Sequence, residues 1–330
     1  MGGVSQTDHP RPRRRRRPLR WTAGLLVLVA VVGYFIVQRE SNGGGGAPYC
    51  TASADIGAAD GSGSGPAGSY EMSPEQAANA ATIAAVGVSK GMPDRAVTIA
   101  LATAMQESAL RNLDHGDRDS LGLFQQRPSQ GWGTPEQIMD PVYSAGIFYD
   151  RLAEIKGYSR LPLTVAAQKV QLSAFPQAYA KHEPDATVLT TAFTGGGHLT
   201  CTGLAPTAPG DPAKVRAELT RLLGKNGPHT MPAEPSRTED GRGAIAESEV
   251  TLVEKRDGGE AATRGSRVLA QWAVAHSREL GIARVSYFPQ AWIAGKDGGR
   301  WQDKGGSGAK DGDGDPHNAS PGEVRIFVHG

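Results

Sequence analysis

The fold is decided by residues 93–108, which read PDRAVTIALATAMQES. Pro93 and Asp94 are typical of the first positions of a helix. The apolar residues that follow repeat at the spacing of one helical face: Val97, Leu101 and Met105. Small side chains occupy the neighbouring face: Ala100, Thr103 and Ala104. The stretch therefore predicts a helix that carries Glu107 near its C-terminal end, with room for a groove beside it.

More helices are expected on both sides of this one. Ser73 and Gln76 have the spacing of a capping box, which predicts a helix that continues to Lys90. Apolar residues recur with helical spacing in two later stretches, residues 141–155 and 163–172. A further helix is expected at residues 211–223, between Pro-rich and Gly-rich stretches. The end of the chain predicts one helix and two strands: residues 266–280, 283–288 and 323–328. The expected fold class is a mainly α domain followed by a small α+β domain.

The N-terminus has the pattern of a membrane anchor. Seven Arg residues lie within residues 1–20, and an uncharged apolar run follows at residues 21–37. A bilayer core of ~30 Å needs roughly 17 to 25 such residues, and flanking positive charge stays in the cytoplasm. The pattern predicts a cytoplasmic basic head and a transmembrane helix, with the remaining chain outside. A cleaved signal peptide is the alternative, although residues 38–42 offer no small-residue cleavage site.

The rest of the chain divides by composition into four parts. Residues 38–70 are mainly Gly, Ser, Ala and Asp, which predicts a flexible stalk. The mainly α domain follows, then a helix with a linker, then the α+β domain: residues 71–205, 206–244 and 245–330. The net charge is only +1 although the head is strongly basic, so the remainder is mildly acidic. No nucleic-acid-binding surface is therefore expected.

The chain has two cysteines, Cys50 and Cys201, and both fall on the predicted outer side of the membrane. Disulfides persist there, and a bond between these residues would tie together the two ends of the mainly α domain. We expect this disulfide, with two separate thiols as the alternative.

Glu107 is the candidate catalytic residue. Apolar neighbours and the negative end of its own helix both favour the protonated carboxyl, and cleavage of a glycosidic bond requires such an acid. The alternative is an exposed Glu107 that pairs with Arg111, one turn later.

Two short motifs favour the catalytic interpretation. Gln106-Glu107-Ser108 ends the helix, and Gly122-Leu123-Phe124-Gln125 follows after a polar loop. Together they resemble the goose-type lysozyme and lytic transglycosylase superfamily over about residues 74–183, with Phe124 where Met is usual. The resemblance implies a lysozyme-like fold and cleavage of bacterial peptidoglycan strands outside the cell membrane. It implies no cofactor.

The resemblance also implies roles for individual residues. Glu107 would be the general acid, while Ser108 and Gln125 would contact the bound sugar. The superfamily's third signature, Ala-Tyr-Asn, is absent, and its nearest counterpart is residues 175–180, which contain Tyr179. Tyr179 would stabilise charge at the bound sugar, with a core aromatic residue as the alternative. Trp132 lies between two glycines and is either a platform for a sugar ring or a buried anchor.

The type of cleavage depends on a second carboxylate. An inverting hydrolase needs a base that activates water, and the polar loop offers three candidates: Asp114, Asp117 and Asp119. Lytic transglycosylases lack this base and form an anhydro sugar instead. Both outcomes stay open from the sequence. The loop lacks the spacing of a calcium site.

Residues 245–330 resemble a C-terminal domain of some secreted cell-wall proteins, through residues 268–272 and the last strand. That domain carries an Asp-His-x-His zinc motif in its last strand, whereas this chain has residues 323–328, EVRIFV, without the His pair. No metal site is therefore expected. These departures leave an alternative to catalysis, a peptidoglycan-binding or scaffold protein without activity. The sequence identifies no protein partner.

Overall fold

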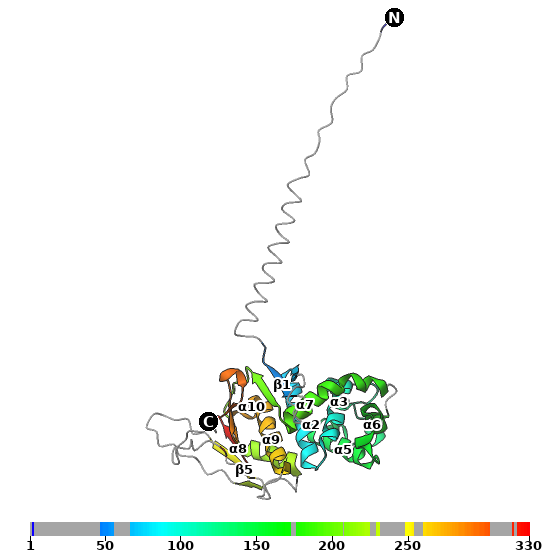
Figure 1. Cartoon of the computed structure of the whole chain (residues 1–330). Helices are drawn as coiled ribbons and strands as arrows, with labels where there is room; N and C mark the ends of the chain where they lie inside the picture. The colour runs from blue at the N-terminus through cyan, green and yellow to red at the C-terminus, as the bar shows by residue number, and fades with distance from the viewer. Residues whose placement is uncertain are drawn as a thin grey trace, which may run out of the picture. The chain divides into compact units, whose positions relative to one another are not determined.

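The computed structural model describes residues 2, 47–55, 67–172, 176–206, 208–224, 229–231, 248–253, 260–303, 319 and 322–330. Residues Pro48–Gly330 form one compact unit (Figure 1). The predicted transmembrane segment at residues 21–37 lies outside the described residues, as does the basic head except Gly2. Within the described part of the chain, no helix is both long enough and apolar enough to cross a bilayer.

Helices make up most of the unit. The described α-helices are α2 (Pro74–Ser89), α3 (Asp94–Ser108), α4 (Pro135–Ile138), α5 (Pro141–Glu154), α6 (Leu163–Gln171), α7 (Glu183–Thr194), α8 (Pro212–Leu223), α9 (Glu260–Ala275) and α10 (Ser277–Leu280). Short 3₁₀ helices lie between them: η2 (Pro128–Gln130), η3 (Tyr158–Arg160), η4 (Pro176–His182) and η6 (Asp297–Gly299). The helices expected from periodicity are thus present, with ends shifted by a few residues.

Helix α2 lies at the centre of the unit, between α3 and α5 on one side and α9 on the other (Figure 1). The predicted capping box is present, because Gln76 N donates to Ser73 Oγ and Ser73 N donates to Gln76 Oε1. Alanines fill the middle of the helix, and small side chains allow several neighbours to pack closely at once. At Gly87 a Cβ atom would lie 2.7 Å from the ring of Tyr149.

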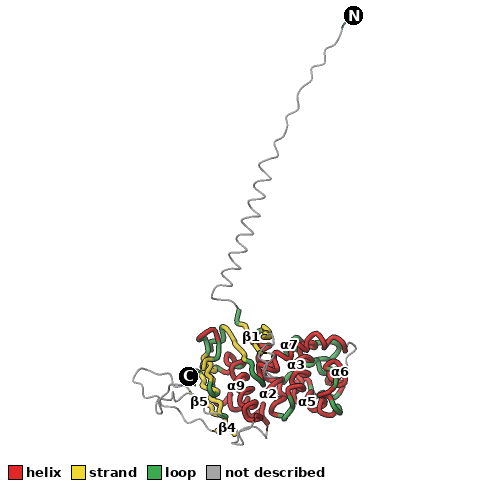
Figure 2. Tube along the Cα trace, viewed as in Figure 1, coloured by secondary structure: helices red, strands yellow, loops and turns green. Residues whose placement is uncertain are grey.

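Two antiparallel sheets complete the unit (Figure 2). The smaller has the order β2-β1-β3, formed by β1 (Tyr49–Asp55), β2 (Ala67–Met72) and β3 (His198–Thr202). The larger has the order β4-β5-β9-β6-β7-β8. Its strands are β4 (His229–Met231), β5 (Ser248–Val253), β6 (Ile282–Tyr287), β7 (Gln290–Ile293), β8 (Gln302–Asp303) and β9 (Glu323–Val328). The two strands expected near the C-terminus correspond to β6 and β9.

The structure differs from the predicted stalk at residues 38–70. Strand β1 lies inside that range, between β2 and β3, and β2 begins there as well. Alternate residues of β1 are fully or almost fully buried: Cys50, Ala52 and Ala54. The composition of residues 38–70 does not predict this strand, because its buried side chains are small. Pairing with β3, more than 140 residues away in the sequence, supplies the partner that the local sequence lacks.

A disulfide joins Cys50 to Cys201, as the sequence predicted. The two residues are directly paired in the register of β1 and β3, and both are buried. The bond closes a loop of 151 residues that contains α2 to α7. Such a cross-link restricts the unfolded chain and leaves the folded chain almost unchanged.

Helix α9 attaches the C-terminal part of the chain to the helices before it. It packs against α2 and α7 as well as against β6 and β9. Arg264 Nε donates to Asp94 Oδ1 over 2.8 Å, at the first residue of α3. Helix α8 lies in the range predicted as a helix with a linker, and it packs against α2 and β5. The two predicted domains are therefore joined by direct packing within one unit.

We predict that loss of the disulfide lowers the stability of the protein by about 2–5 kcal/mol, because the unfolded chain gains the freedom of a long loop. The variant is Cys50→Ala combined with Cys201→Ala, and chemical denaturation of the full-length protein measures the change. Reduced wild type should unfold at the same denaturant concentration as the double variant. An unchanged midpoint in fully reduced protein contradicts the prediction.

Candidate active site at the end of α3

The C-terminal end of α3 is fixed by side chains from α2. Ala109 and Leu110 follow the helix with φ of 52° and 61°, a left-handed conformation that non-glycine residues rarely adopt. Gln76 Nε2 donates to Ala109 O and Asn79 Nδ2 donates to Leu110 O, each over 2.8 Å. These bonds satisfy carbonyls that a helix end leaves without partners. The direction in which the helix presents Glu107 is therefore fixed by α2.

Ser108 joins the helix end to the second motif. Its buried Oγ lies 2.8 Å from Leu123 O and 3.1 Å from Ala104 O. Residues 121–126 form a tight turn, closed by a bridge between Leu121 and Gln126. Ser108 was expected to contact sugar, but its hydroxyl is directed to backbone within the fold. Its position holds the turn against the helix that carries Glu107.

Glu107 is half-buried and makes a short hydrogen bond. Tyr179 Oη donates to Glu107 Oε1 over 2.5 Å, and Tyr179 itself is fully buried in η4. Burial is the larger effect on this carboxyl and raises its pKa. Hydrogen bonds from Tyr179 and Gln171 act in the opposite direction, because they stabilise the charged form. The net shift is upward, so Glu107 keeps its proton to a higher pH than an exposed glutamate does.

Gln171 is a neighbour of Glu107 that the sequence analysis missed. It ends α6, and its Nε2 donates to Phe124 O over 2.7 Å. It therefore connects the turn that contains Phe124 to the carboxyl of Glu107. A glutamine at the end of an amphipathic helix carries no recognisable signal, so only the packing of α6 beside α3 reveals this contact.

The predicted groove beside α3 is not formed by the small residues to which it was assigned. Ala100, Thr103 and Ala104 have no exposed surface. Their small side chains bring neighbouring elements close to α3, chiefly α7, η4 and α2. These small side chains mark a face of α3 that packs closely against other elements, and the groove predicted there is absent from that face.

Gln125 lies on the turn but bends back onto the polar loop. Its φ is 47°, and its Nε2 lies 3.4 Å from His115 O and 3.3 Å from Gly122 O. A Cβ atom on Gly116 would lie 1.8 Å from Gln125 Oε1. The amide expected to contact sugar is therefore engaged with backbone in this structure.

The three loop carboxylates have different surroundings. Asp119 accepts from Arg127 Nε over 2.8 Å and from Ser129 N over 2.9 Å, and these bonds hold its pKa far below the usual range. The hydrogen bond of His115 with Asp114, over 2.7 Å, also lowers the pKa of that carboxyl. Asp117 is exposed beside Arg118. Asp119 is thus a poor base, because its proton affinity is low.

Trp132 is a buried anchor whose ring is covered. Only 5% of its surface is exposed, and Arg151 Cζ lies 3.5 Å from the ring centroid. The same guanidinium donates from Nη2 to Gly131 O over 2.8 Å. Of the two alternatives left by the sequence, the structure supports the anchor.

No group of three or more His, Cys, Asp or Glu side chains in the described ranges is placed to hold a metal ion. One histidine of the C-terminal part of the chain, His317, lies outside the described residues. In comparisons with known proteins, the chain matches no family model and no curated protein sequence.

We predict that Gly122→Ala destabilises the site turn more than Gly131→Ala does. Both glycines have φ above 70°, so each variant should lose about 1–2 kcal/mol from left-handed strain. At Gly122 the new Cβ would also lie 2.6 Å from Ile138 O, which should cost a further ~1–3 kcal/mol, whereas nothing lies within 4 Å at Gly131. Thermal unfolding measures both, and equal losses contradict the packing assigned to the turn.

Proposed function

We propose that this protein is a membrane-anchored enzyme that cleaves the glycan strands of bacterial peptidoglycan outside the cell, with Glu107 as the general acid. One observation carries the proposal, the desolvated carboxyl at the end of α3 that accepts a 2.5 Å hydrogen bond from Tyr179. The motif resemblance around Glu107 and residues 122–125 supplies the substrate class, and the basic head with its apolar run supplies the location.

The geometry supports an acid rather than a structural ion pair. No ion pair of Glu107 exists among the described residues, and in particular the expected alternative contact with Arg111 is absent. Tyr179 holds one carboxyl oxygen and thereby orients the group. A proton on the other oxygen can then pass to the leaving oxygen of a glycosidic bond as that bond breaks.

The loop carboxylates favour the transglycosylase outcome of this proposal. An inverting hydrolase needs a carboxylate that accepts a proton from water. Two of the three candidates are engaged, Asp119 by Arg127 and Ser129 and Asp114 by His115, which leaves the exposed Asp117 as the one loop carboxylate for a hydrolase. In the alternative route, the substrate's own acetamido oxygen attacks the anomeric carbon while Glu107 protonates the leaving oxygen. A hydroxyl of the same sugar then attacks that carbon, displaces the acetamido oxygen and returns its proton to the Glu107 carboxylate. That route requires no second carboxylate and ends in an anhydro sugar.

A second candidate function is glycan binding without cleavage. It is supported by two departures from the resembled enzymes: residues 175–180 lack the Ala-Tyr-Asn signature, and residues 323–328 lack the His pair of the zinc motif. The reaction products distinguish cleavage from binding alone. Mass spectrometry of peptidoglycan treated with the protein separates anhydro ends, reducing ends and intact strands.

We predict that full-length wild type solubilises peptidoglycan and that Glu107→Gln reduces the rate by about 10²- to 10⁴-fold, since the amide cannot donate the proton. Glu154→Gln is the matched control, because Glu154 is an exposed glutamate at the end of another helix, α5. The control should retain the wild-type rate. Equal activity of Glu107→Gln and wild type, with both variants folded, rejects Glu107 as the acid.

We also predict a pH shift in Tyr179→Phe. Its hydrogen bond stabilises the charged carboxyl, so its removal should raise the pKa of Glu107 further. Because the acid must be protonated to act, activity falls as pH rises through this pKa. The alkaline limb of the kcat/KM profile should therefore move to higher pH in the variant. An alkaline limb that stays in place or moves to lower pH contradicts this role of Tyr179.

A further inference from the structure

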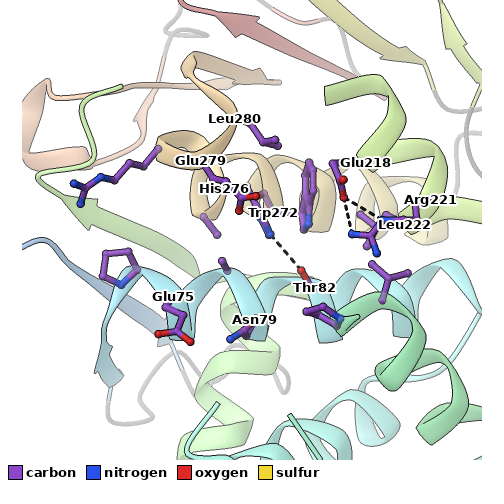
Figure 3. Close-up of a pocket in the computed structure, with 16 residues that line it drawn as sticks. Glu75, Asn79, Thr82, Glu218, Arg221, Leu222, Trp272, His276, Glu279 and Leu280 are labelled. Atoms are coloured by element: carbon purple, nitrogen blue, oxygen red, sulfur yellow. Dashed lines mark hydrogen bonds and ion pairs between the residues drawn. The ribbon is translucent and has the colours of Figure 1, made fainter. Parts of the chain in front are cut away.

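Polar side chains of the unit differ in whether they have partners. A cavity of about 590 Å³ lies between α2 and the helices α8, α9 and α10, and polar side chains bond to one another on its wall (Figure 3). His276 Nε2 lies 3.4 Å from Thr82 Oγ1, and Arg221 is paired with Glu218 over 2.6 Å. At the Glu107 site, by contrast, a buried polar atom has no hydrogen bond within the described part of the chain: Gln171 Oε1.

The side-chain amide of Gln171 is fixed in one orientation. One of its atoms lies 2.7 Å from Phe124 O, and a backbone carbonyl accepts hydrogen bonds but cannot donate them. The atom at this position is therefore the nitrogen, Nε2. A half-turn of the amide would place Oε1 there, so that two acceptors would face each other. Phe124 is held in place, because its ring is fully buried and stacks on Phe148 with centroids 4.6 Å apart.

The fixed amide presents a donor to Glu107 and no acceptor. Gln171 and Glu107 share a hydrogen bond, and this bond lowers the pKa of the carboxyl. Because Oε1 has no hydrogen bond within the described residues, the bond comes from the second hydrogen of Nε2. A protonated Glu107 therefore finds no acceptor on this amide. The N–H favours the carboxylate, which is the form that remains after an acid has donated its proton.

No charged group among the described residues competes with this effect on Glu107. Two titratable side chains of η4 lie at this end of α3. Tyr179 Oη donates to Oε1 of the carboxyl over 2.5 Å, and His182 Nε2 lies 3.2 Å from Gln106 Oε1. Burial lowers the pKa of His182, which favours its neutral ring. Burial and the donated hydrogen bonds thus decide how readily Glu107 releases its proton.

We propose that Gln171 is a positioning residue for the acid. Its amide, held by Phe124 O, donates to the Glu107 carboxylate that forms when the proton passes to the leaving oxygen. This role rests on the proposed function, whereas the contact itself can be measured without it. Without the donor, burial makes the carboxyl hold its proton more tightly, and such an acid transfers the proton more slowly. The same amide couples the turn at residues 121–126 to the chemistry, since it binds both.

The test measures the pKa of Glu107 by carbon-13 NMR of the full-length protein, in Gln171→Met and in Ser108→Ala. Methionine resembles glutamine in size but has no donor, so the pKa of Glu107 should rise above its wild-type value. Ser108→Ala is the matched control, because it removes the donor to Leu123 O, the neighbouring carbonyl of the same turn, and retains the Gln171 amide. A pKa that is unchanged in Gln171→Met, or that rises no more than in Ser108→Ala, overturns the proposal.

If Gln171→Met does not fold, Gln171→Lys decides, because an ammonium group supplies a donor and a positive charge beside the carboxyl. The pKa of Glu107 should then fall, and an unchanged or higher pKa overturns the proposal.

Activity on peptidoglycan separates this proposal from the proposed function. Gln171→Met should lower kcat about 10-fold, since a donor to a charged group is lost, and should move the alkaline limb of the profile to higher pH. A raised pKa in Gln171→Met supports the fixed donor even if the wild type is inactive, a result that would reject the proposed function alone. An active wild type with an unchanged pKa in Gln171→Met rejects only the role of Gln171.

Discussion

The account of this protein depends on one hydrogen bond between partners that are far apart in the sequence. Tyr179 donates to Glu107 across 72 residues, in a site from which water is partly removed. The bond fixes the orientation of the carboxyl, and burial raises its pKa. Neither effect is sufficient alone, because an exposed glutamate is ionised at neutral pH and an unfixed one has no defined direction. The surrounding structure maintains both conditions.

That structure is built from contacts that converge on the end of α3. Gln76 and Asn79 hold the two strained residues after the helix, and Ser108 holds the turn at residues 121–126. Gln171 then connects this turn to Glu107. The disulfide between β1 and β3 closes the chain around these helices. Each of these contacts joins different elements, so the site exists only when α2, α3, α6 and η4 have packed together.

The sequence predicted what local patterns encode. Periodicity gave α3 and α5, the capping box gave the start of α2, and the cysteine positions gave the disulfide. It did not predict features that depend on tertiary partners. Strand β1 was hidden by small residues, the alanines of α3 were interpreted as a groove, and Gln171 carried no signal. The directions of Ser108 and Gln125 depend on backbone carbonyls that only the folded turn brings near.

The most direct test of the central claim is the titration of one carboxyl. Carbon-13 NMR of protein labelled at glutamate side-chain carboxyls, compared between wild type and Glu107→Gln, isolates the resonance of Glu107. The account predicts a pKa above the ordinary glutamate value of 4.5, because burial outweighs the two hydrogen bonds. A pKa at or below 4.5 would show that burial does not outweigh the hydrogen bonds, and the role of Glu107 as an acid would be withdrawn.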